Sequence, residues 1–195
     1  MASFETFWRD IYGEIPPVRY RLRLEYLDSR WVRFHSLPES KRYPDSVTEM
    51  GIVLERENAL ADRVLGVGSE CWMIANSFLN LAEELAEQFS EHRLVRVNFK
   101  PQESYSWRDP YEKPENQTLW TTYAGEFLWQ HGEFDEAFKI ISEDIETNVL
   151  WVSKEMKSIF SPHDGGIDLV VRNSEEIIFL KNEFEDWLSH HSRGF

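Results

Sequence analysis

The sequence predicts an α+β fold, a single globular domain over residues 1–195 with helices packed on a mixed or mainly antiparallel sheet. Segments with a helical repeat of apolar residues and segments with a strand-like repeat follow one another without a strict β-α-β rhythm. The length of 195 residues suits one domain of above-average size. A chain of this length buries about 70% of its unfolded surface, so it needs no disulfide or metal to fold.

Five segments are predicted to be helices because their apolar residues recur three and four positions apart. Ser3, Ser46 and Ser174 are the expected N-caps of three of them, and Glu49 completes a capping box with Ser46. The predicted helices span residues 3–12, 46–65, 80–89, 132–145 and 174–190. The residues of the last helix expected to face the core are Ile177, Leu180, Phe184, Trp187 and Leu188.

Eight segments have the alternation or the apolar composition of β-strands. Residues 18–27 place Val18, Tyr20, Leu22 and Leu24 on one face and charged side chains on the other. A turn at 28–30 separates this segment from residues 31–35, so the two are expected to form a hairpin. The predicted strands span residues 18–27, 31–35, 70–78, 94–99, 119–130, 148–152, 158–160 and 167–171, with a break expected at Gly125.

Two further segments are expected to be loops. Residues 36–45 contain two prolines and mixed charge, and residues 100–117 contain three prolines interleaved with aromatic side chains such as Trp107. Long irregular loops often carry function. The aromatic residues between positions 105 and 123 are therefore a candidate surface for a small molecule.

The chain is acidic, with 35 Asp and Glu against 21 Lys and Arg and a formal net charge of −14. Such a field repels nucleic acids and anionic membranes and attracts cations. We expect no nucleic-acid or membrane partner, and the charge favours a cationic protein partner. The alternative is that the carboxylates only confer solubility. The oligomeric state is left open.

Eight Trp, seven Tyr and thirteen Phe give the chain a high aromatic content, which suits a ring-rich core or an aromatic binding surface. The single cysteine, Cys71, allows no intramolecular disulfide, as is usual in a reducing compartment. The first residues lack the pattern of a signal peptide, and no apolar run is long enough to span a membrane. We therefore expect a cytoplasmic protein.

The first candidate site is the stretch from Ser161 to Val171, which contains His163, Asp164 and Asp168 around two glycines. Asp-Gly is a strong signal for a tight hairpin turn, because glycine supplies the positive φ angle. In a catalytic interpretation, His163 is a general base that Asp164 or Asp168 orients. In a structural one, Asp164 forms the turn and Asp168 anchors hydrogen bonds.

The second candidate site runs from His35 to Tyr43. As an enzyme it would use Ser36 or Ser40 as nucleophile and His35 as base, although the chain has no G-x-S-x-G motif. As a binding patch it would present Glu39, Lys41, Arg42 and Tyr43. The structural alternative is a loop held by its own ion pairs.

Metal and cofactor motifs are missing from the sequence. The six histidines form no H-x-x-x-H or H-E-x-x-H pattern, and one cysteine supplies no thiolate pair. There is no P-loop and no G-x-G-x-x-G. We expect no metal and no cofactor.

Two stretches carry a resemblance. The stretch His-Ser-Leu-Pro-Glu-Ser-Lys-Arg-Tyr at 35–43 and the Asp-Gly-Gly-Ile-Asp strand at 164–168, followed by the last helix, resemble a bacterial family known only as a domain of unknown function. The resemblance implies no catalytic residues. The small size and acidic composition are also loosely similar to bacterial immunity proteins, which neutralise toxins.

These observations favour a non-catalytic, acidic protein-interaction domain, and more specifically an immunity-type inhibitor of a basic bacterial toxin. The first alternative is a hydrolase that uses His35 or His163 with Asp164 or Asp168. It requires the two candidate sites to converge. The second alternative is a small-molecule-binding domain.

Overall fold

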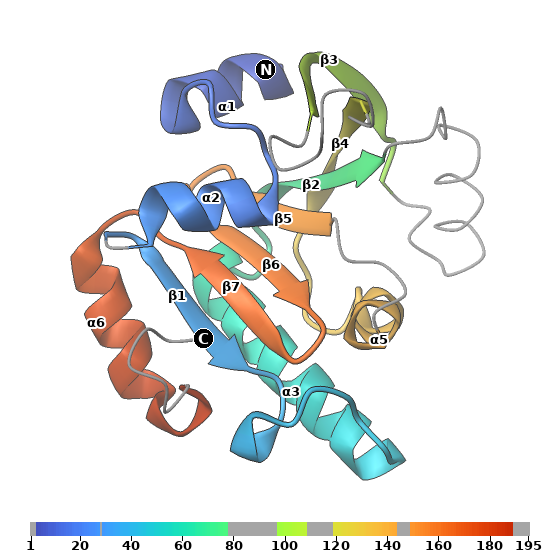
Figure 1. Ribbon diagram of the computed structural model, residues 1–195, viewed down its shortest axis with the longest axis vertical. Helices are drawn as coiled ribbons and strands as arrows, with labels where there is room; N and C mark the ends of the chain where they lie inside the picture. The colour runs from blue at the N-terminus through green and yellow to red at the C-terminus, as the bar shows by residue number, and fades with distance from the viewer. Residues whose placement is uncertain (1–2, 28, 78–96, 109–118, 144–148, 189–195) are drawn as a thin grey trace.

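The computed structural model describes residues 3–27, 29–77, 97–108, 119–143 and 149–188 (Figure 1). The strands are β1 (Trp31–His35), β2 (Glu70–Ser77), β3 (Lys100–Arg108), β4 (Leu119–Leu128), β5 (Val149–Ser153), β6 (Ile159–His163) and β7 (Gly166–Val170). The α-helices are α1 (Phe4–Tyr12), α2 (Arg19–Tyr26), α3 (Val47–Leu65), α5 (Asp135–Ser142) and α6 (Ser174–Glu183). Two short 3-10 helices are η1 (Pro38–Ser40) and η4 (Glu185–Trp187).

The seven strands form one sheet in the order β1-β7-β6-β5-β2-β4-β3, and every neighbouring pair is antiparallel. The predicted α+β class is therefore confirmed. The sheet places β1, from the first part of the chain, beside β7 from its last part. This pairing brings the two candidate sites next to each other.

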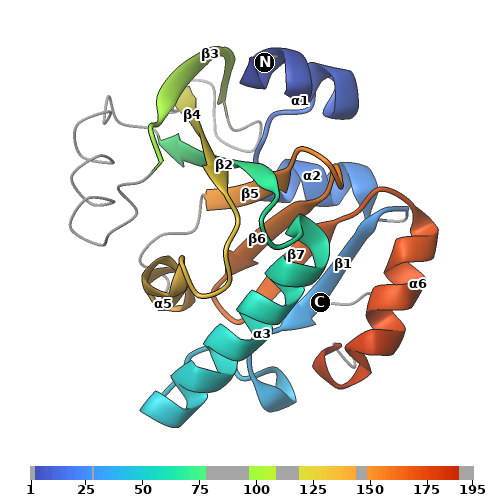
Figure 2. The same ribbon diagram turned by 180° about the vertical axis from the view of Figure 1, so that it is seen from behind.

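Each face of the sheet is covered by its own helices (Figures 1 and 2). On one face, Trp8 of α1 and Leu22 of α2 pack in a buried apolar cluster with side chains of the strands. On the other face, Leu60, Phe138 and Leu180 bring α3, α5 and α6 into a second cluster. None of the described helices has both the length and the apolar character needed to cross a bilayer.

Four of the five predicted helices are present, and residues 80–89 lie outside the described part of the chain. The hydroxyls of Ser3 and Ser46 accept hydrogen bonds from the backbone of the first turn, as expected. Asn173, rather than Ser174, caps α6, because its side chain accepts a hydrogen bond from the Glu176 N–H. Helices α5 and α6 are both shorter than predicted. The predicted inward side chains of the last helix do pack on the core: Ile177, Leu180, Phe184, Trp187 and Leu188.

The prediction of a strand over residues 18–27, and hence of a hairpin with residues 31–35, is wrong. The segment forms helix α2. The reason is that its apolar residues satisfy two periods at once. Val18, Leu22 and Tyr26 are four positions apart, and these three contact the core, whereas Leu24 is 51% exposed. Packing against the sheet decided between the two patterns.

The remaining strand predictions hold for β1, β2, β4, β5, β6 and β7, and β4 runs through Gly125 without a break. Residues 100–108 were expected to lie in a loop but form β3. Strand β3 is the last in the sheet order, and an edge strand accepts a residue such as Pro101 that lacks a backbone N–H. Residues 97–99 are not in a strand, whereas residues 94–96 and 109–117 lie outside the described residues.

Candidate functional site

The first candidate site is a β-hairpin. His163 pairs with Gly166 at the ends of β6 and β7, so Asp164 and Gly165 form the two-residue turn that the sequence predicts. Gly165 has φ of 80°, a conformation that glycine adopts freely. A Cβ on Gly166 would lie 2.8 Å from the Phe34 carbonyl oxygen and 3.3 Å from the His163 ring. Both glycines are therefore required by the geometry of this turn.

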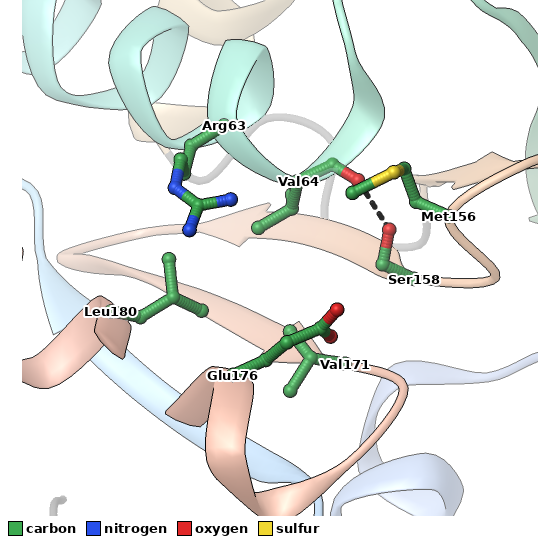
Figure 3. Close-up of a pocket in the computed structure, with 7 residues that line it drawn as sticks. All are labelled: Arg63, Val64, Met156, Ser158, Val171, Glu176 and Leu180. Carbon is green, nitrogen blue, oxygen red and sulfur yellow. Dashed lines mark hydrogen bonds between the residues drawn. The ribbon is translucent and has the colours of Figure 1, made fainter. Parts of the chain in front are cut away.

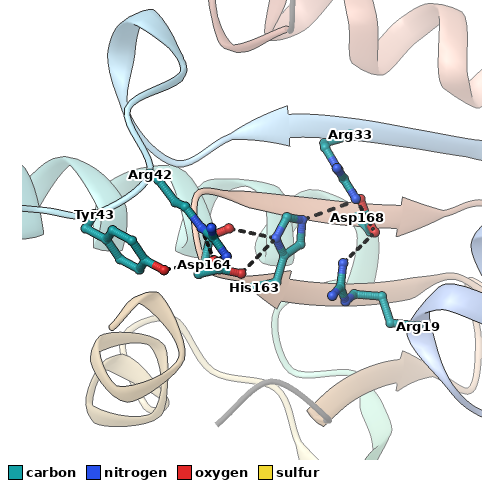
Figure 4. A network of polar contacts seen from close by, with 7 residues as sticks. All are labelled: Arg19, Arg33, Arg42, Tyr43, His163, Asp164 and Asp168. Atoms are coloured by element: carbon teal, nitrogen blue, oxygen red, sulfur yellow. Dashed lines mark hydrogen bonds and ion pairs between the residues drawn. The ribbon is translucent and has the colours of Figure 1, made fainter. Parts of the chain in front are cut away.

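The register of β1, β7 and β6 brings the two candidate sites together. His35 and His163 are both paired with Gly166, one from each side. Arg33 is paired in the same way with Asp168. Directly paired residues lie on the same face of a sheet. The histidines, Arg33 and Asp168 thus share the face that α1 and α2 cover. Together with Arg19, Arg42, Tyr43 and Asp164, these polar side chains form what we call the His163–Asp168 network. Figure 4 draws all of its members except His35.

Asp168 is the centre of this network and is 3% exposed. Arg33 donates to it from Nε at 2.6 Å and from Nη2 at 3.0 Å, and Arg19 Nη1 lies 3.4 Å away. Burial alone would raise the pKa of this carboxyl, but the neighbouring His163 and Arg33 outweigh burial and hold the pKa well below its usual value. Asp168 is therefore ionised at neutral pH.

His163 lies between two carboxyl-bearing residues and is 7% exposed. Its Nδ1 is 2.8 Å from the backbone carbonyl oxygen of Asp164. Because a carbonyl oxygen only accepts, Nδ1 carries a proton. Its Nε2 is buried, lies 3.6 Å from Asp168 Oδ1 and has no hydrogen-bond partner among the described residues.

Asp164 ties the hairpin to the loop that follows η1. The Arg42 guanidinium and the Tyr43 hydroxyl both contact its Oδ2, the hydroxyl at 3.3 Å. The Arg42 guanidinium also lies 5.1 Å from the centre of the Tyr43 ring. The Arg42 side chain is 62% exposed, so this contact lies at the rim of the network.

His35 lies across Gly166 from His163. Burial lowers the pKa of His35, and the positive charge of Arg33 adds to this effect. A hydrogen bond with the Gly165 backbone opposes these effects, but the net result lowers the pKa and favours the neutral imidazole. Its backbone carbonyl accepts a hydrogen bond from Arg56 of α3 at 2.8 Å.

Three of the predicted site residues do not join the network. Glu39 is exposed and has φ of 56°. Lys41 instead binds Glu49 at 2.6 Å and Asp45 at 2.8 Å. Trp107 is in β3, but its side chain lies outside the described part of the structure. The residues that the sequence interpretation missed are Arg19 and Arg33. No local pattern links either arginine to Asp168, which lies 149 positions from Arg19 and 135 positions from Arg33.

The candidate catalytic residues His163, Asp168 and Ser36 are all buried. A general base must reach a substrate proton. Asp168 instead accepts bonds from two arginines, and the Nε2 of His163 is buried against it. The hydroxyl of Ser36, a predicted nucleophile, is also buried. Among the described residues, no group of three or more His, Cys, Asp or Glu side chains is arranged to hold a metal ion.

A second buried carboxyl, Glu57 of α3, lies in the other layer and is 0% exposed. Burial raises its pKa well above the usual value and the charge of Asp135 adds to the rise, whereas the Ser36 hydroxyl opposes it. Neither carboxyl oxygen is within hydrogen-bonding geometry of a described group. Burial therefore favours the protonated, neutral form of Glu57.

A narrow crevice lies between α3, the β5–β6 connection and α6 (Figure 3). Arg63 and Val64 of α3 line one side, and Glu176 and Leu180 of α6 line another. Its cavity volume is about 10 Å³, which has room for one water molecule at most. The crevice is too small to be a ligand site.

Residues 18–192 match the model of a family described as Domain of unknown function (DUF3885). The chain belongs to the DUF3885 family. The match covers the whole His163–Asp168 network and α6, and it begins just before α2. No curated protein matches the chain, and no solved structure matches it. The predicted resemblance to a domain-of-unknown-function family is thus confirmed, and membership in DUF3885 assigns no activity.

Proposed function

We propose that this DUF3885 chain is a non-catalytic protein-interaction domain that binds a basic protein, as an immunity-type inhibitor of a basic bacterial toxin. The observation that carries the proposal is the placement of the acidic side chains. The chain has 35 Asp and Glu, and among the described ones only Glu57 and Asp168 are buried. Burial favours the neutral form of Glu57, and Asp168 is bound to arginines, so the negative charge of the described residues is carried mainly by exposed or partly exposed side chains.

The electrostatic field of an acidic surface extends beyond contact distance. An excess of one charge steers an oppositely charged protein toward the surface and raises the association rate, and dissolved salt weakens the effect. An inhibitor that works by covering its target needs no reactive group of its own. A non-catalytic role is consistent with the His163–Asp168 network, in which the carboxylates are bonded to arginines.

The test is affinity purification of the full chain from its native host, followed by binding measurements with the purified partner. We expect a basic protein in stoichiometric amount, and an association rate that falls at least tenfold between about 0.05 and 1 M salt. Asp10→Asn, an exposed single change on α1, is the control for small changes in net charge. A partner that is not basic, or a rate that salt leaves unchanged, would contradict the proposal.

A further inference from the structure

Helix α6 has an apolar outer face as well as an apolar inner one. Leu180 is buried against the core, whereas Ile178 is 60% exposed and Phe179 is 63% exposed. Glu175 and Asn182 are also exposed and lie three and four positions from Ile178, on the same side of the helix. We call the outer residues Glu175, Ile178, Phe179 and Asn182 the α6 stripe.

The α6 stripe faces away from the rest of the molecule. In both ribbon views α6 forms one lateral edge, beside β1, and no described element lies outside it (Figures 1 and 2). Two neighbouring exposed apolar side chains, Ile178 and Phe179, form a contiguous patch, and such patches mark surfaces that bind partners. Aromatic side chains of this kind are frequent energetic centres of interfaces.

The surroundings of the stripe are acidic. Residues 172–188 contain five carboxylates and two basic side chains. Glu183 pairs with Arg63 at 3.0 Å, whereas Glu175, Glu185 and Asp186 are exposed. An apolar centre with an acidic rim is complementary to a segment that has apolar residues on one side and basic residues on the other.

The same charges disfavour two other occupants. A second copy of the chain would bring the acidic surroundings of one stripe close to those of the other, and like charges across an interface are repulsive. An anionic membrane would be repelled in the same way. We therefore propose, on the basis of the proposed function, that the α6 stripe is the docking surface for a basic amphipathic helix of the partner protein.

The experiment uses the full chain and a helical probe peptide of Leu and Lys, about 18 residues long, with Leu on one face. Binding is measured by fluorescence anisotropy for the wild type and for Ile178→Ser/Phe179→Ser. We expect the double substitution to weaken binding at least about tenfold and to leave the unfolding transition unchanged, because both side chains are exposed. A matched peptide of Leu and Glu is expected not to bind.

Val47→Ser/Val67→Ser is the matched control, since these two apolar side chains are also exposed but lie on α3 and in the α3–β2 connection. It is expected to bind like the wild type. Equal binding by all three proteins would overturn the docking surface, as would self-association in sedimentation or binding to anionic vesicles that the Ile178→Ser/Phe179→Ser change abolishes. Loss of the docking surface is distinguishable from loss of the proposed function, which fails if the wild type captures no basic protein or if salt leaves its association rate unchanged.

Discussion

The His163–Asp168 network and the α6 stripe place opposite kinds of side chains in opposite environments. In the network, Asp168 is 3% exposed and is held by Arg33 and Arg19. In the stripe, Phe179 is 63% exposed, and apolar atoms face water without cover from the fold. The side chains most suggestive of catalysis are thus bound to one another within the fold, whereas the side chains that are most exposed on α6 are apolar.

The largest effect expected is the loss of stability in Asp168→Asn. This change removes the carboxylate that binds Arg33, whose side chain is 12% exposed. Removing one partner of a buried ion pair costs about 3–5 kcal/mol. Urea unfolding at pH 7 measures the loss, with Asp10→Asn as the control on an exposed carboxylate. A loss below about 1 kcal/mol would show that the network is not what secures β1, β7 and α2 to one another.

Glu57 sharpens the comparison, because it is a buried carboxyl whose oxygens, unlike those of Asp168, have no hydrogen-bond partner among the described residues. Its pKa is raised in the folded state, so its contribution to stability is complete below the unfolded pKa of about 4.3 and is lost as the pH rises toward the folded value. Glu57→Gln removes this dependence. We expect the free energy of unfolding of Glu57→Gln, relative to wild type, to rise by up to about 1.4 kcal/mol per pH unit above pH 5.

Asp168 is expected to show the opposite dependence. Its pKa is lowered in the folded state, so its contribution is present above the unfolded pKa of about 3.9 and is lost as the pH falls below that value. Urea unfolding of wild type, Glu57→Gln and Asp168→Asn between pH 3 and pH 8 separates the two carboxyls. Parallel curves for wild type and Glu57→Gln above pH 5 would mean that Glu57 is not protonated.

The smallest effect is expected at the rim of the network. Asp164→Asn weakens the contact with Arg42, whose side chain is 62% exposed, and the turn conformation is retained because Asn also suits it. Exposed ion pairs contribute up to about 1 kcal/mol. Thermal unfolding is expected to show a small shift, and a loss as large as that of Asp168→Asn would place Asp164 among the essential anchors of the fold.

The parts predicted from the sequence are those decided by neighbouring residues. The Asp164-Gly165 turn and the Ser46 cap of α3 depend on contacts within a few positions, and both are present. Helix α2 was missed because Val18, Leu22 and Tyr26 fit a helix as well as a strand, and only the sheet beneath them selects the helix.

Only part of the candidate site was predicted, because its two arginines Arg19 and Arg33 and the bonds that they make with Asp168 were missed. That His163 and Asp168 lie near the loop of Arg42 follows from the pairing of β1 with β7, which no local pattern specifies. Arg33 meets Asp168 across 135 positions of sequence, so the arginine that determines the state of this carboxyl could not be named. The outward position of Phe179 likewise depends on which side of α6 packs against the core.

The hydrolase alternative makes a distinct prediction. The convergence of His35 and His163 on one face meets its geometric requirement, but the Nε2 atom of each imidazole is buried. If the network is structural, His163→Gln changes stability and leaves partner binding intact. If it is catalytic, the wild type hydrolyses a substrate from a panel of esters, amides and phosphate esters, and His163→Gln does not.

The most direct test is the dissociation constant of the natural basic partner measured side by side for wild type, His163→Gln and Ile178→Ser/Phe179→Ser. We expect His163→Gln to bind within about twofold of the wild type, and the α6 double variant to bind at least about tenfold more weakly with an unchanged unfolding transition. The reverse result, in which His163→Gln loses binding and the α6 variant keeps it, would place the function in the network and contradict the assignment to α6.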